Sequence, residues 1–76
     1  MNAENRKSLQ KAIDLLNEAK EIIEQIGEEE QEKFDNLSEG LQQSERGQRM
    51  EEVASNLSDT ASNIDDVIYE VEQAME

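Results

Sequence analysis

The sequence predicts an all-α protein, folded as an antiparallel helical hairpin that dimerises into a four-helix bundle. Two long stretches carry apolar residues at helical spacing, and turn-forming residues separate them. There is no proline to interrupt either stretch. With 76 residues in a single domain, the chain is too short for a large core of its own, so we expect a partner to complete it.

The first helix is expected over residues 2–34. At 100° per residue its apolar side chains fall within an arc of about 180°, opposite Asp14, Glu18 and Glu21. These apolar residues are Leu9, Ala12, Ile13, Leu15, Leu16, Ala19, Ile22, Ile23 and Ile26. Gly27 follows the last of them and weakens the prediction of helix beyond that point.

A corner is expected over residues 35–44. Turn and cap residues gather there, namely Asp35, Asn36, Ser38 and Gly40, and Ser44 is placed to cap the next helix. Phe34, Leu37 and Leu41 can pack together under such a corner.

The second helix is expected over residues 45–75. Its apolar arc of about 160° contains Val53, Ala54, Leu57, Ala61, Ile64, Val67, Ile68, Val71, Ala74 and Met75. Gly47, in the first turn, costs up to about 1 kcal/mol in a helix. Either another segment of backbone approaches it closely, or the helix begins later.

The two helices are of similar length, about 45 to 50 Å each, which favours an antiparallel pair. Both apolar arcs are wider than the stripe of about 100° that one neighbouring helix covers. The residues left over are Leu15, Ile22, Val67 and Ala74. We expect a second copy to cover them in a symmetric bundle, and a different protein is the alternative.

The charge is strongly negative and unevenly distributed. Twenty acidic residues against seven basic ones give a net charge of −13, and residues 50–76 contain eight acids and no cation. Such a chain repels nucleic acid and anionic membranes, so we expect it to bind neither directly. The polar N-terminal residues lack a signal sequence, which predicts a cytoplasmic protein.

Catalytic and metal-binding signatures are missing. The chain has no histidine and no cysteine, so its serines lack the usual activating base and zinc lacks its usual ligands. Residues 35–46 resemble a calcium loop in length, but Leu37 and Arg46 occupy two ligand positions. We therefore expect neither an enzyme nor a cofactor or metal site.

Two groups of residues are candidates for binding a partner. One lies near the end of the first helix, where the helix dipole favours cations, and the other lies on the outer face of the second helix. The candidates are Glu28, Glu29, Glu30 and Glu32, followed by Glu51, Asp59, Asp65, Asp66, Tyr69 and Glu70. Tyrosine is enriched at binding hot spots. The net charge amounts to about one charge per 3.5 Å of rod, close to the 3.4 Å spacing along one DNA strand.

The segment EEEQEKFDNLSEGLQQSERGQRMEE, residues 28–52, resembles a corner found in small acidic all-helical accessory proteins of bacterial viruses and mobile elements. This resemblance implies an accessory or host-takeover role, including inhibition of host nucleases or defence systems. We therefore expect a homodimeric, non-enzymatic module that occupies a basic, nucleic-acid-binding site of a host protein. The alternatives are a structural scaffold whose apolar surface is functional, and an oligomer that holds a small ligand between subunits.

Overall fold

The computed structural model describes residues 1–76 and contains three helices and no strand. These are α1 (Ala3–Asp35), α2 (Glu39–Gln42) and α3 (Glu45–Ala74). The prediction of an all-α protein is confirmed. The sequence predicted helices over residues 2–34 and 45–75. It did not predict the short helix α2 within the corner.

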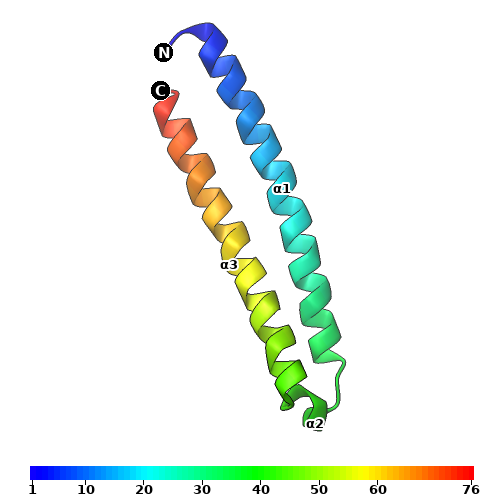
Figure 1. The fold of residues 1–76 in the computed structure, drawn as a ribbon. Helices are drawn as coiled ribbons and strands as arrows, with labels where there is room; N and C mark the ends of the chain where they lie inside the picture. Colours follow the sequence, from blue (N-terminus) through cyan, green and yellow to red (C-terminus); the bar gives the residue numbers. More distant parts are fainter.

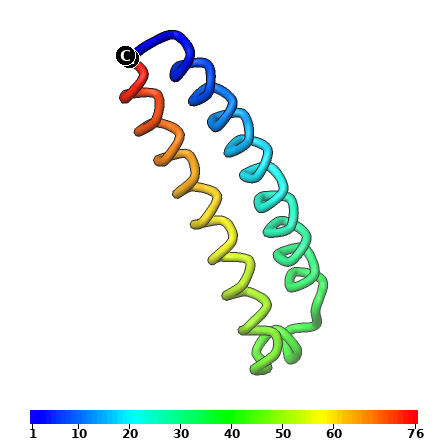
Figure 2. Tube along the Cα trace, turned by 45° about the horizontal axis from the view of Figure 1, so that its top comes forward, coloured from blue at the N-terminus to red at the C-terminus, as the bar shows by residue number.

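The two long helices lie side by side and run in opposite directions, with α2 at the corner between them (Figure 1). The two chain ends meet at the other end of the rod, and a second view shows the same arrangement (Figure 2). The Cα envelope measures 58 × 15 × 12 Å. Only six of the 76 residues are buried, so the pair has a thin interior.

The buried residues follow a seven-residue repeat, the spacing of a coiled coil. In α3 the buried residues Gly47, Ala54, Ala61 and Ile68 are seven apart. We label the repeat so that these are position a. In α1, position a then holds Arg6, Ile13, Lys20, Gly27 and Phe34, and at the end of α3 it continues to the C-cap Met75. Position d holds Leu9, Leu16, Ile23 and Glu30 in α1 and Met50, Leu57, Ile64 and Val71 in α3. Positions a and d form the seam between the two helices.

Small residues make the middle of the seam narrow. A Cβ atom added to Gly27 would lie 3.3 Å from Cβ of Leu57 and 3.8 Å from the carbonyl oxygen of Ala54. Backbone of α1 therefore packs directly against α3 at this point. This close approach explains why Gly27 stands inside α1 rather than at its end.

The corner is held by side-chain caps and by one close backbone contact. Ser44 is the N-cap of α3, as the sequence predicts, and its Oγ accepts a hydrogen bond from the Gly47 amide at 3.1 Å. A Cβ on Gly47 would overlap the carbonyl oxygen of Leu41 and lie 2.8 Å from that of Gln42. Gly47 thus allows the end of α2 to pack on the first turn of α3, which does begin at Glu45.

Candidate interaction surfaces

The helix pair has two long sides that differ in chemistry. In an antiparallel coiled coil, the e positions of both helices lie along one side of the seam and the g positions along the other. We call the e side, with the adjoining b positions, the groove flank. The g side, with the adjoining c positions, is the apolar flank. The f positions form the outer ridges.

A shallow groove runs along the groove flank between α1 and α3. Its small residues Gly27, Ala54 and Ala61 belong to the narrow part of the seam, so the groove exists because the seam lacks large side chains there. The other lining residues are polar or acidic, namely Glu24, Glu28 and Gln31 of α1 and Ser55, Ser58, Asp59, Ser62 and Asp65 of α3. The groove therefore offers carboxylates and hydrogen-bonding groups to a partner.

Lys20 is the cation nearest the groove. It occupies position a, where its side chain is 21% exposed, and its Nζ donates to Oδ1 of Asp65 at 2.8 Å. The hydrogen bond to Asp65 raises the pKa of Lys20, partial loss of water around the ammonium opposes the rise, and the charges of Asp65, Glu24 and Glu21 add to it. Lys20 thus neutralises one groove acid and leaves the others unpaired.

The structure brings together only some of the ten predicted partner-binding residues. Glu28 and Asp65 line the groove from the groove flank, and Asp59 lines it from the adjoining outer ridge. Glu51 and Tyr69 lie on the groove flank outside the groove. The remaining five are dispersed: Glu32 and Asp66 lie on the outer ridges, Glu29 and Glu70 lie at c positions of the apolar flank, and Glu30 is half-buried at position d. Tyr69 is 63% exposed.

Three residues of this region were missed by the sequence reasoning. Glu24 and Gln31 lie at e positions of α1 and line the groove, and Lys20 lies in the seam beside it. A strict seven-residue repeat would have identified Glu24 and Gln31, because it separates e positions from the apolar arc. Near the end of α1, Nζ of Lys33 donates to Oε1 of Glu30 at 3.2 Å.

The apolar flank exposes large side chains. Leu15 is 56% exposed, Ile22 54% and Val67 43%, and Ala74 is exposed at the end of the same flank. The g positions from Ala12 onward in α1 are Ala12, Ala19 and Ile26 as far as the last turn and a half of the helix, and those from Val53 to the end of α3 are Val53, Thr60, Val67 and Ala74. None of them is charged, in a chain in which 36% of residues are charged. The four residues predicted to be left over therefore share one flank, on which Glu70 is the charged residue next to Val67 and Ala74.

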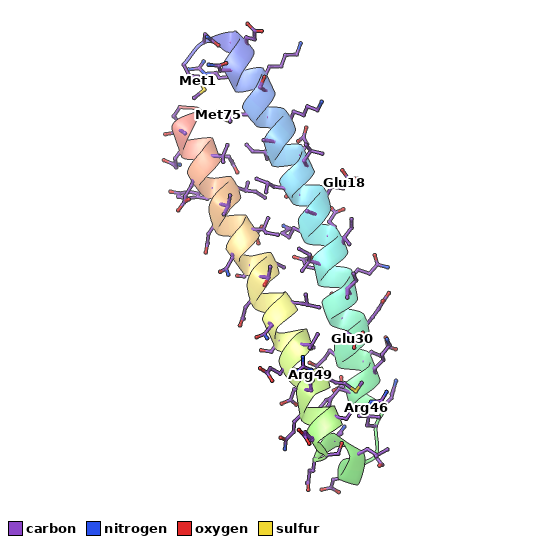
Figure 3. The ribbon with its side chains drawn as sticks, in the orientation of Figure 1. Met1, Glu18, Glu30, Arg46, Arg49 and Met75 are labelled. Atoms are coloured by element: carbon purple, nitrogen blue, oxygen red, sulfur yellow. The ribbon has the colours of Figure 1, made fainter.

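The net charge is placed on the other surfaces of the rod. Three cations and two acids stand on the apolar flank, namely Lys33, Arg46, Arg49, Glu29 and Glu70. One cation and eight acids stand on the groove flank, namely Lys7, Asp14, Glu21, Glu24, Glu28, Asp35, Glu51, Asp65 and Glu72. The outer ridges are also acidic, and Figure 3 shows Glu18 pointing away from α3 and both Arg46 and Arg49 near the corner.

Comparisons with protein-family models, with curated proteins and with solved structures found no match. No helix of the chain combines the length and the apolar content that crossing a bilayer requires. No three acidic side chains converge as metal ligands. The two flanks themselves are therefore the features of the molecule that bear on its function.

Proposed function

We propose that this chain is a non-enzymatic, acidic protein-interaction module. It acts as a helical hairpin that dimerises through the apolar flank into a four-helix bundle and presents the groove flank to a basic site on another protein. The observation that carries the proposal is the division of charge: eight acids and one cation stand on the groove flank, whereas two acids and three cations stand on the apolar flank.

The basic site is one that normally binds nucleic acid. Coiled-coil packing makes the rod stiff, so its carboxylates are held at fixed positions along 58 Å, as phosphates are along a duplex. Opposite charge on the partner would speed the encounter and orient the docking. The resemblance of residues 28–52 to accessory proteins of bacterial viruses supports a host protein as the target and inhibition as the outcome.

A binding experiment with a purified partner tests this function. Proteins captured from a bacterial lysate are identified, and the best binder is purified and titrated at about 50 and 500 mM salt, with and without duplex DNA. We expect affinity to fall at least tenfold between the two salt concentrations, since exposed charges are then screened. DNA is expected to compete for the same site.

A pair of triple variants separates a docking surface from general acidity. Glu24→Gln, Glu28→Gln and Asp59→Asn together neutralise the groove, and Glu4→Gln, Glu18→Gln and Glu52→Gln remove the same charge from the ridges. The groove variant is expected to lose at least tenfold in affinity, or about 1.4 kcal/mol, and the ridge variant much less. Equal losses, or binding that ignores salt and DNA, contradict the proposal.

A structural scaffold is the second candidate function, because the exposed apolar flank is itself an interaction surface. In that case the acids only keep the protein soluble. If the protein is a scaffold, substitutions on the apolar flank abolish binding of its partner. If it is an inhibitor, substitutions in the groove do so.

A further inference from the structure

We propose that the second copy docks on the apolar flank upside down, about a two-fold axis that passes beside Ala19, so that the two corners lie at opposite ends of the bundle. This inference rests on the dimer of the proposed function and specifies how its copies are arranged. Four observations on the flank support it.

The first observation is that charge and area allow a second copy to dock on the apolar flank and on no other side. Two chains of net charge −13 repel each other on the groove flank and along the ridges, where acids predominate. The apolar flank is the side without this repulsion, and its face of about 58 by 15 Å matches the roughly 800 Å² that each partner contributes to a standard interface.

The second observation is that the apolar stripe of α1 is self-complementary when inverted. Ala12 lies seven residues before Ala19 and Ile26 lies seven residues after it. Leu15 lies four residues before Ala19 and Ile22 lies three residues after it. An inverted copy therefore places Ala12 against the partner's Ile26 and Leu15 against the partner's Ile22. Ala19 meets its own counterpart, and small against large residues let two helices interdigitate.

The third observation is that α3 has the same property about a centre at a similar height. Val53 and Ala74 lie equally far from the midpoint between residues 63 and 64, as do Thr60 and Val67. The bond from Lys20 to Asp65 and the contact of Gly27 with Leu57 place Ala19 level with residues 65–66, close to this midpoint. A single axis therefore serves both helices to within about 3 Å, which is less than one helical turn.

The fourth observation is the position of the flank's cations. Lys33, Arg46 and Arg49 all lie at the corner end, whereas Glu70 lies toward the chain ends. An upright dimer, with its axis along the rod, would gather six cations at one end and set Leu15 against Val67. The inverted dimer separates the two cationic clusters and places each toward the end of the partner's flank that carries Glu70 and no cation.

The inverted dimer has a functional consequence. Because the two copies meet on their apolar flanks, their groove flanks face away from each other on opposite sides of the bundle. Each dimer then offers two equivalent grooves. We expect two partner molecules to bind per dimer.

Single cysteine variants test the arrangement, since the chain has no cysteine of its own. Residues on a two-fold axis approach their own copies, so Ala19→Cys should form a disulfide-linked dimer under mild oxidation. Ser62→Cys, exposed on the groove flank, is the matched control. We expect cross-linking of Ala19→Cys to be at least tenfold faster than that of Ser62→Cys.

A mixture of Leu15→Cys with Val67→Cys tests the upright dimer. Faster cross-linking in this mixture than in Ala19→Cys overturns the inverted arrangement, and so does equal cross-linking of Ala19→Cys and Ser62→Cys. Sedimentation of reduced Ala19→Cys distinguishes the two levels of failure. A dimer that does not cross-link at position 19 refutes the arrangement alone, whereas a monomer refutes the dimer of the proposed function as well.

Discussion

Lys20 and Asp65 connect the middle of the two long helices, with Nζ of Lys20 2.8 Å from Oδ1 of Asp65. Lys20 stands in the seam between the apolar residues Leu16 and Ile23, and Asp65 is 57% exposed at the groove. A polar residue at position a fixes register in coiled coils, because a shifted alignment leaves it without a partner. The same pair therefore sets the register of the helices and belongs to the wall of the groove.

The pair predicts a loss of stability at alkaline pH. The pKa of Lys20 is raised above its ordinary value of 10.5, so the folded state holds this proton more tightly than the unfolded state. The stabilisation is complete below pH 10.5 and disappears as the pH rises through the raised value. Thermal unfolding from pH 8 upward should show a steeper decline for the wild type than for Asp65→Asn. If the melting temperatures of the two proteins fall equally with pH, protonation of Lys20 is not linked to folding through Asp65.

The three glycines predict an order of stabilities on substitution by alanine. Gly47→Ala places a methyl group against fixed backbone of Leu41 and Gln42, and we expect a net loss of about 1 to 3 kcal/mol despite alanine's better helix propensity. Gly40→Ala is the matched control, since no atom lies within 4 Å, and it should gain about 0.5 kcal/mol. The change in stability of Gly27→Ala should lie between these two values, because its new Cβ would lie 3.3 Å from Cβ of Leu57, a tight contact but not an overlap. Urea unfolding measures all three, and a stabilising Gly47→Ala would refute the close packing of α2.

The fold was predictable to the extent that it depends on periodicity. Apolar spacing located both long helices, and the excess width of each arc identified Leu15, Ile22, Val67 and Ala74. The short helix α2 and the need for Gly47 were not predictable, because both depend on a contact that closes only after the chain turns.

The groove was predictable only in part, for a geometric reason. A rotation of 100° per residue spreads the seam over a wide arc and merges it with the residues beside it. In the coiled coil of α1 and α3, the positions that face the neighbouring helix instead repeat every seven residues. This repeat places Glu24 and Gln31 beside the seam and Glu29 on the apolar flank. Acid content alone could not separate Glu28, which lines the groove, from Glu32, which lies on a ridge.

The N-cap of α3 predicts a local loss of stability. Ser44 Oγ accepts from the Gly47 amide and donates to the Leu41 carbonyl, so it connects α2 to α3. Ser44→Ala should cost about 1 kcal/mol. Ser38→Ala removes a longer bond of 3.4 Å at a helix of four residues and should cost less. Equal costs in chemical unfolding would show that Ser44 contributes nothing beyond an ordinary cap.

The last turn of α3 contains no basic residue, although a helix C-terminus favours positive charge. Glu72→Gln should therefore raise the free energy of unfolding by about 0.3 to 1 kcal/mol at low salt. The gain should shrink at about 500 mM salt, because screening weakens the interaction with the dipole. Gln73→Asn, next in the chain and uncharged, is the control for a change at this turn, and a gain in Glu72→Gln that ignores salt would exclude an electrostatic cause.

Polar substitution of the apolar flank separates the two candidate functions. Leu15→Ser with Ile22→Ser removes two side chains that are more than half exposed, so the folded helix pair should survive while the dimer dissociates. Leu41→Ser is the matched control, since Leu41 is equally exposed but lies at the corner, and its sedimentation should match the wild type. If the protein is an inhibitor, monomers of the double variant still bind the basic partner, with one groove each and without the gain from two linked sites. If it is a scaffold, the double variant loses its partner entirely and neutralisation of the groove acids has no effect.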